Sequence, residues 1–317
     1  MMRRLFTSAP ALGCAVLIAA CAIACGQKSP RTFATPEDAA QELMRVAKTG
    51  TLDDLIALFG PDSKELADGS DPATGRMNRQ TFAVAARESW KLTDDGPDRK
   101  VLVIGNEAWP FPVPIVKDGT SWRFDAAAGK EEVIARRIGR NELAVIAVAR
   151  TYVAAQKQYA LDGHDGKPAG LYAQSFRSDP GKHNGLYWQA SRGERLSPLG
   201  DLVAQAAEEG RVAASGGAQP SSFHGYHFKI LAAQEAAAPG GAKSYVVNGD
   251  MSAGFALVAW PADYDVTGVM TFIVNQEGVV REKDMGTDTD AAARAMTGYN
   301  PDDSWTVVPA AEPSATR

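Results

Sequence analysis

The N-terminal third of the chain passes from a helical to a strand-like pattern of apolar positions. Thr35, followed by a proline and two carboxylates, is typical of a helix start, and apolar residues then recur at helical spacing as far as Gly50. Two further helices and then three strands are predicted over residues 52–59, 81–90, 100–106, 109–117 and 120–125. Helices followed by an antiparallel hairpin, with its turn at 117–120, indicate a small α+β domain spanning residues 32–128.

The second half of the chain begins with a long helical pattern and continues with strands. Apolar residues fall along one side of residues 130–161, which predicts an amphipathic helix about 45 Å long at 1.5 Å per residue. A shorter helix is expected at 199–212. Later candidate strands lie at 226–232, 245–247, 256–260, 269–275 and 279–283. We therefore expect an α+β domain over 129–308, with the long helix packed on an antiparallel sheet, and a disordered tail at 309–317.

The extreme N-terminus has the composition of an export signal. Two arginines precede an apolar stretch, residues 5–24, which contains small residues before Cys21 and again before Cys25. This segment resembles the bacterial lipoprotein signal, in which a cysteine thiol takes a diacylglyceryl group and becomes the new N-terminus. The branched residue three positions upstream favours Cys21, whereas the glycine and glutamine that follow favour Cys25, which we prefer.

The resemblance to a lipoprotein signal implies a signal peptide at 1–24 and a tether at 25–31. An uncleaved membrane anchor and a plain secretory signal are the alternatives. In the lipoprotein interpretation the protein is exported and held by lipid at a periplasm-facing membrane surface.

Charge and cysteine usage narrow the possible partners and compartments. Removing the signal with Arg3 and Arg4 takes the net charge from −5 to −7. An acidic chain without a run of lysine or arginine is a poor candidate for binding nucleic acid or an anionic membrane surface. No cysteine follows Cys25, so the exported body forms no disulfides and its domains depend on their hydrophobic cores.

The sequence carries none of the common motifs of catalysis or cofactor binding. We find no GxGxxG after a strand, no GxxxxGK[ST], no HExxH, no CxxC and no GxSxG. No cofactor is therefore predicted, and a non-catalytic role is favoured. The absence of motifs does not by itself exclude an activity.

The segment 162–192 is the strongest candidate functional region, because it is too long and too rich in glycine to be a simple connector. One interpretation is a contact surface of aromatic and cationic residues, the types that dominate interface hot spots. Its members are Tyr172, Arg177, Tyr187, Trp188 and Arg192. The alternative is that these aromatic residues pin the loop onto the sheet.

The same segment also contains the residue types of a mixed imidazole and carboxylate metal site. The candidate ligands are Asp162, His164, Asp165 and His183. Two histidines in a loop are more often solvated or hydrogen-bonded locally, so no metal is predicted.

Three blocks of sequence resemble a known family over nearly the whole mature chain. They are FATPEDAAQELMRVAKTGTLDDLIALFGPD, DGTSWRFDAAAGKEEVIARRIGRNELAVI and GFALVAWPADYDVTGVMTFIVNQEGVVREKD. Together they resemble the bacterial domain of unknown function 2950 family. That resemblance implies an exported envelope protein and provides no catalytic residues to carry over.

The C-terminal half is also similar to the globular part of type IV pilins and type II secretion pseudopilins. The similarity lies in RTYVAAQKQYALDG, GYHFKIL and VMTFIVNQEGVVREKD. In those proteins a long helix lies across an antiparallel sheet. This chain lacks the prepilin cleavage motif and the apolar first half of that helix, so it is not expected to polymerise as a pilin does.

The favoured function is a lipid-anchored cell-envelope protein that acts as a binding or assembly module, with other envelope proteins as partners. One alternative is an envelope hydrolase that acts on cell-wall or lipid material through the 162–192 loop. Another is a carrier of small ligands with a pocket around Trp90, Trp109 and Trp122.

Overall fold

The computed structural model describes residues 29–63, 72–191, 193–200 and 222–309. Both candidate lipidation cysteines, Arg192, most of the helix predicted at 199–212 and the tail beyond residue 309 lie outside these ranges. The chain divides into two compact units, Met1–Ala126 and Ala127–Arg317. The division falls two residues before the domain boundary predicted from the sequence.

The first helices of the N-terminal unit begin and end at the predicted signals. Helix α1 covers Pro36–Thr49, and the Thr35 hydroxyl accepts a hydrogen bond from the backbone N–H of Asp38 at 3.1 Å. Helix α2 covers Leu52–Phe59 and starts with a reciprocal capping box between Thr51 and Asp54. These short helices are therefore determined largely by local sequence.

The third helix of this unit differs from its predicted bounds. Helix α4 covers Pro72–Glu88 rather than 81–90, and Trp90 begins a strand instead of ending the helix. The expected strand at 109–117 is also broken into two short strands. Pro110, Pro112 and Pro114 explain the break, because proline has no N–H to donate to a strand ladder.

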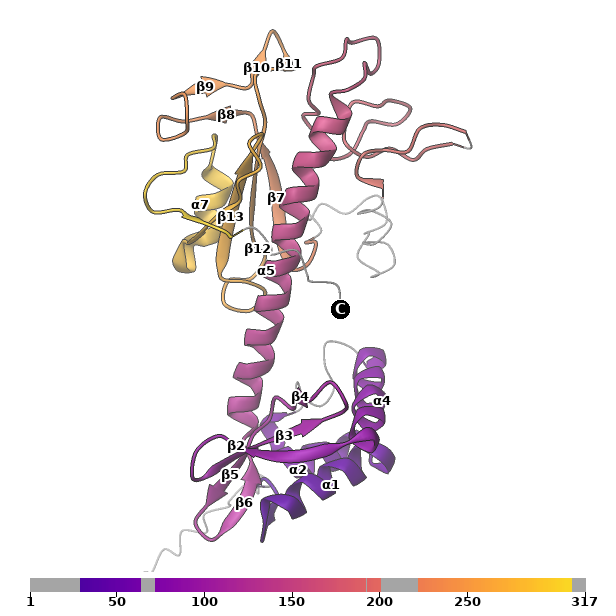
Figure 1. The fold of residues 1–317 in the computed structure, drawn as a ribbon, viewed down its shortest axis with the longest axis vertical. Coiled ribbons are helices and arrows are strands. Elements are labelled where there is room, and N and C mark those ends of the chain that lie inside the picture. The colour runs from indigo at the N-terminus through magenta and orange to yellow at the C-terminus, as the bar shows by residue number, and fades with distance from the viewer. Residues whose placement is uncertain (1–28, 64–71, 192, 201–221, 310–317) are drawn as a thin grey trace, which may run out of the picture. The chain divides into compact units, whose positions relative to one another are not determined.

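The strands of the N-terminal unit form one antiparallel sheet in the order β1-β6-β5-β3-β2, with β4 paired to β3 (Figure 1). Their bounds are β1 Thr32–Phe33, β2 Trp90–Asp94, β3 Arg99–Ile104, β4 Trp109–Pro110, β5 Ile115–Asp118 and β6 Ser121–Phe124. The β5–β6 hairpin turns at the predicted position, with Asp118 opposite Ser121. The sequence did not indicate β1 or β2.

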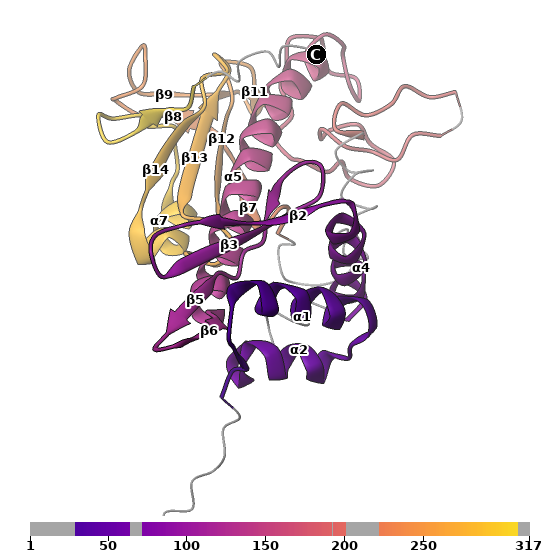
Figure 2. The same cartoon turned by 60° about the horizontal axis from the view of Figure 1, so that its bottom comes forward.

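Helices α1, α2 and α4 pack against this sheet and bury its apolar side chains (Figure 2). Leu43 and Leu58 of the helices share one core with Ile115 and Phe124 of the strands. The rings of Phe59 and Phe124 meet edge to face, with their centroids 5.1 Å apart. The N-terminal unit therefore has a hydrophobic core of its own, as expected for an α+β domain.

The C-terminal unit is organised around the 34-residue helix α5, Ala126–Tyr159, and an antiparallel sheet. The sheet order is β15-β14-β13-β12-β7. The bounds are β7 Tyr226–Leu231, β12 Ala256–Pro261, β13 Met270–Asn275, β14 Arg281–Asp284 and β15 Thr306–Val307. The predicted arrangement of a long helix on an antiparallel sheet is confirmed, and the fold class is α+β.

Shorter elements complete the C-terminal unit. Two small hairpins pair β8 with β9 and β10 with β11, and helix α7 packs beside β12. Their bounds are β8 Ala233–Gln234, β9 Lys243–Ser244, β10 Val246–Val247, β11 Asp250–Met251 and α7 Thr289–Ala295. Single 3-10 turns occupy Pro61–Ser63 in the first unit and Gly286–Asp288 in the second. No helix among the described residues is both long enough and apolar enough to cross a membrane.

The C-terminal half of α5 is attached to the sheet by packing and by hydrogen bonds. Val145, Ala149 and Tyr152 lie in the core, and the Tyr152 hydroxyl donates to the backbone carbonyl of Ala256 at 3.2 Å. All six residues of β12 are buried, which requires cover on both faces of the sheet. Helices α5 and α7 both pack in the core around this strand (Figures 1 and 2).

A second attachment joins α5 to the first residues of β13. A single carboxylate oxygen of Glu142 accepts hydrogen bonds from the backbone N–H groups of Val269 and Met270, at 3.0 and 2.9 Å. Beside this contact, Tyr226 is fully buried and its hydroxyl donates to the carbonyl of Met270 at 3.0 Å. Gly268 lies directly against the Tyr226 ring, because a Cβ there would fall 2.0 Å from the hydroxyl oxygen.

We expect Gly268→Ala to destabilise the C-terminal unit by about 1–3 kcal/mol, because the added methyl group would clash with the buried Tyr226 ring and its hydroxyl. Hydrogen exchange of the β13 amides measures this unit alone. Gly139→Ala is the matched control, since nothing lies within 4 Å of a Cβ there and alanine favours the helix by about 0.5–1 kcal/mol. Equal exchange in the two variants would contradict the expected clash.

Candidate functional site

The loop that follows α5 is attached to the helix through a buried glutamine. The Gln156 side chain is completely buried, and its amide donates to the carbonyl of Ala173 at 2.8 Å while its oxygen accepts from the Ala173 N–H at 2.9 Å. The same amide nitrogen lies 3.1 Å from the Tyr152 hydroxyl. Gln156 therefore bonds both backbone groups of Ala173, as a neighbouring strand would, and positions the start of the candidate site.

Sequence reasoning missed Gln156, although the pattern contained a signal. Gln156 lies between Tyr152 and Tyr159 on the apolar side of α5, where a polar residue must find a hydrogen-bond partner once it is buried. A polar residue that interrupts an apolar stripe is thus a marker of a specific tertiary contact.

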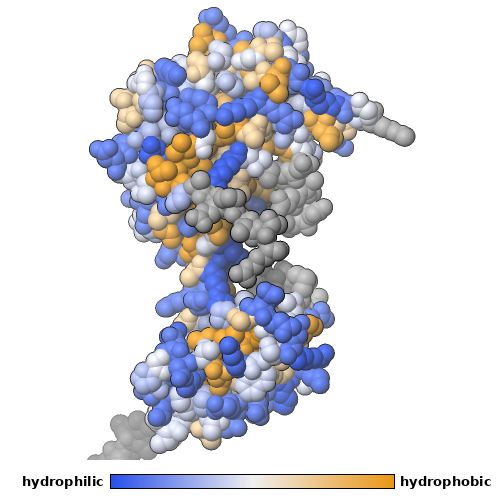
Figure 3. Space-filling view, in the orientation of Figure 1, coloured by the Kyte–Doolittle hydropathy of each residue, from blue (hydrophilic) through white to orange (hydrophobic). Residues whose placement is uncertain are grey.

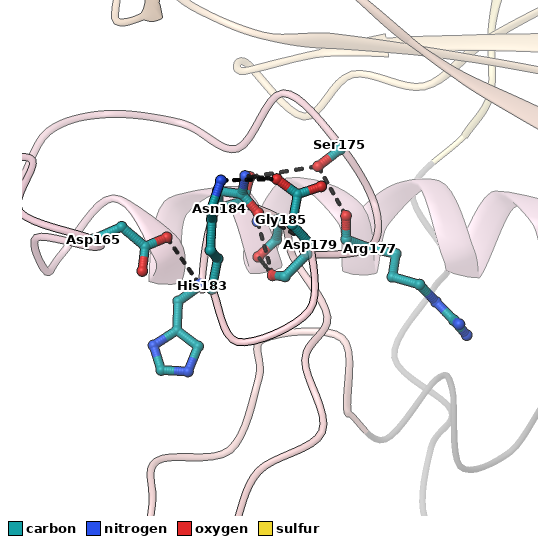
Figure 4. A network of polar contacts seen from close by, with 9 residues as sticks. Asp165, Ser175, Arg177, Asp179, His183, Asn184 and Gly185 are labelled. Carbon is teal, nitrogen blue, oxygen red and sulfur yellow. Dashed lines mark hydrogen bonds and ion pairs between the residues drawn. The ribbon is translucent and has the colours of Figure 1, made fainter.

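Beyond Ala173, the chain folds back on itself in an irregular hairpin held by many hydrogen bonds (Figure 4). The Ser178 N–H donates to the Tyr187 carbonyl at 2.8 Å, and the Tyr187 N–H donates to the Phe176 carbonyl at 2.8 Å. At the tip, Asp179 and Asn184 exchange two bonds of 2.9 and 2.8 Å. The loop is therefore ordered by its own polar groups, without extended strands.

The structure separates the four described residues of the predicted contact surface. Arg177 is exposed, and its guanidinium carbon lies 5.7 Å from the centroid of the half-buried Tyr187 ring. Trp188 is only 8% exposed, belongs to the core and donates from its indole to the carbonyl of Arg195 at 3.2 Å. Tyr172 packs edge to face on Phe255, with centroids 4.8 Å apart.

Trp188 and Tyr172 therefore pin the loop to the body of the unit, as the alternative interpretation proposed. The accessible pair is Arg177 and Tyr187, which we call the loop contact pair. The fifth predicted residue, Arg192, lies outside the described residues.

The four candidate metal ligands each have a protein partner. The Asp162 carboxylate forms an ion pair with Arg195, and Asp165 accepts a bond from the backbone N–H of His183 at 2.9 Å. The His183 imidazole lies 2.8 Å from Glu194. Within the described ranges, no group of three or more His, Cys, Asp or Glu residues is placed to hold a metal ion.

His164 is packed into a group of aromatic rings rather than pointed at the other candidate ligands. Its ring stacks on Tyr159 with centroids 4.0 Å apart, and its Nε2 lies 2.9 Å from the Tyr159 carbonyl. Because a carbonyl oxygen only accepts, Nε2 carries the hydrogen. The rings of His164 and His183 lie 5.8 and 4.5 Å from Trp188, so both histidines help to pack the loop.

Local hydrogen bonds and burial shift several pKa values in this region. The side-chain amide of Asn184, followed by Lys182, holds the pKa of Asp179 below its ordinary value of 3.8. The backbone N–H of Ser191 lowers the pKa of Glu194, with a smaller contribution from His183. Burial raises the pKa of Tyr159 to about 12, so its hydroxyl stays protonated and donates to the His183 carbonyl at 2.8 Å.

The three tryptophans proposed for a carrier pocket are not gathered around a cavity. Trp90 and Trp109 stand opposite Ile104 on neighbouring strands and are 37% and 44% exposed, and Figure 3 shows apolar surface over this sheet. Trp122 packs against the core of the N-terminal unit. A hollow between α1 and α4 is lined by other residues, among them Lys48 and Val84.

The protein is thus an α+β protein of two units. In the C-terminal unit, an ordered but irregular loop follows α5 and is attached to this helix and to the core. The chain belongs to the family described as Protein of unknown function (DUF2950), whose model matches residues 30–308. The chain matches no curated protein and no solved structure. The family resemblance seen in the sequence is confirmed, whereas the similarity to pilins stays a prediction.

We expect Gln156→Leu to loosen the 170–190 loop, because it leaves the N–H and carbonyl of Ala173 buried without partners. Each such group costs about 1–3 kcal/mol. Hydrogen exchange of the loop amides is the measurement, with the β12 amides as the internal reference. Gln158→Leu is the control, since this residue is exposed on the same helix. Loop protection that matches the control would show that Gln156 does not position the loop.

The hydrogen bond that the Asp179 carboxylate accepts from the Asn184 side-chain amide is expected to weaken in acid. A lowered folded pKa means that the carboxylate stabilises the loop above pH 3.8, and that this contribution is lost as the pH falls through the folded pKa. The NMR shift of the Asn184 side-chain amide should therefore titrate with a midpoint below 3.8. This titration should be absent in Asp179→Asn, and a midpoint at or above 3.8 in the parent would contradict the contact.

Proposed function

We propose that this protein is a lipid-anchored component of the cell envelope that works as a binding or assembly module. The anchor is a cysteine at the end of the export signal, Cys25 in preference to Cys21. The seven residues from Cys25 to Arg31 span at most about 25 Å, so a lipid on Cys25 keeps the N-terminal unit close to the membrane surface. The binding element is the loop of the C-terminal unit.

The observation that carries the proposal is the order of the hairpin around the loop contact pair. Binding immobilises the side chains and loops of an interface, and this loss of conformational entropy reduces affinity. Here the hydrogen bonds between Asp179 and Asn184 and along the hairpin have already removed much of that freedom. Arginine and tyrosine are also enriched at the energetic centres of interfaces.

Cross-linking in the native membrane, followed by mass spectrometry, tests the binding role. Arg177→Ala and Tyr187→Ala should each reduce recovery of envelope partners by about fivefold or more, the equivalent of roughly 1 kcal/mol at a hot spot. Lys157→Ala is the control, because it removes one positive charge from an exposed position outside the loop. Partners recovered equally with all three variants would contradict the loop as the contact site.

Labelling with radioactive palmitate tests the anchor. Cys25→Ala is expected to abolish incorporation, while Cys21→Ala retains it. The reverse pattern would move the anchor to Cys21. A parent chain that takes up no label would exclude lipid attachment and leave the plain secretory signal.

A further inference from the structure

A cavity of about 220 Å³ opens beside the loop, where the last turn of α5 faces the loop and β11. Tyr159 and Met251 are both buried, so the core of the unit fixes part of its wall. The rings of His164 and Tyr172 also line it. Arg177 and Tyr187 are not among its lining residues, so this site is separate from the loop contact pair.

The polar groups that line the cavity retain mainly hydrogen-bond acceptors. One oxygen of Asp165 accepts from the His183 N–H, and one oxygen of Asp250 accepts from Lys167. The amide nitrogen of Gln174 donates to the carbonyl of Gly249 at 2.9 Å. The second carboxylate oxygens and the Gln174 carbonyl oxygen therefore keep lone pairs for a ligand that donates several hydrogen bonds.

Charge and size exclude several ligand classes. Two carboxylates and one lysine line the cavity, and the lysine is already paired with Asp250, so an anion such as phosphate would meet net negative charge. An acyl chain would bury these polar groups without hydrogen bonds. The volume is also below the roughly 300–1,000 Å³ of sites for drug-sized ligands, which leaves room for one small ring.

We infer that this cavity binds one uncharged polyhydroxylated ring, as a free monosaccharide or as the terminal unit of a glycan. The hydroxyl groups of the ring donate to Asp165, Asp250 and Gln174. Its apolar C–H faces pack on the aromatic side chains of the wall. The loop thus combines a pocket for a sugar ring with a separate contact pair.

Two variants of the full mature chain test the site. Asp165→Asn removes the charge without changing the shape, and asparagine tolerates the left-handed backbone at this position, where φ is +48°. Leu171→Trp fills the cavity, because Leu171 lines it and is half-buried. Asp265→Asn is the matched control, since this exposed aspartate has a φ of +62° and does not line the cavity.

The measurement is ligand-detected NMR and calorimetry with glucose, galactose, mannose, N-acetylglucosamine and their short oligomers at millimolar concentration. Glucosamine and glucose 6-phosphate are the charged comparisons. We expect a neutral sugar to bind the parent, with a loss of about tenfold in Asp165→Asn, loss of detectable binding in Leu171→Trp and no change in Asp265→Asn. An oligomer that binds at least as tightly as its monomer identifies a glycan end as the ligand, whereas tighter binding of the monomer identifies a free sugar.

Three results would overturn the inference. They are no binding of any neutral sugar, binding that survives both cavity variants, and binding of glucosamine or glucose 6-phosphate alone. None of them affects the proposed binding role, because that role is tested by Arg177 and Tyr187 variants outside the cavity.

Discussion

The C-terminal unit depends on the burial of one side of α5 against β12 and its neighbours. Tyr152 is buried in this contact and also donates to the backbone of Ala256, so packing and hydrogen bonding fix the helix at the same place. Glu142 attaches the helix to β13 in the same way. Gln156, a buried polar residue further along α5, is held in place by this packed helix, so the core also positions the start of the loop.

Order in the loop comes from specific polar contacts rather than from regular secondary structure. Backbone bonds between the two sides of the hairpin and the Asp179–Asn184 exchange replace a strand ladder. Trp188 and the histidine rings then attach this hairpin to the body of the unit. The arrangement leaves Arg177 accessible, and it leaves a cavity where the loop approaches β11.

Sequence patterns predicted elements best where a residue type strongly favours one local structure, such as a helix cap or a tight turn. The cap at Thr35 and the hairpin turn at 117–120 are examples, because each is completed by neighbouring backbone groups. The bounds of α4 and the short strands β1 and β2 were predicted poorly. The two residues of β1 form a strand only because they pair with β6, which is distant in the sequence. Strand β2 pairs with the next strand, β3, and was missed because Trp90 was assigned to the preceding helix.

The sequence by itself determined the α+β class, the family, the long helix and the position of the irregular segment, since periodicity and composition are local properties of the chain. It also named Trp188 and Arg177 as equivalent members of one surface. Only the tertiary structure decided that Trp188 is buried and Arg177 exposed, that Gln156 holds the start of the loop, and that Asp165 and Asp250 line one cavity. Burial and convergence depend on which distant segments meet, and no local pattern contains that information.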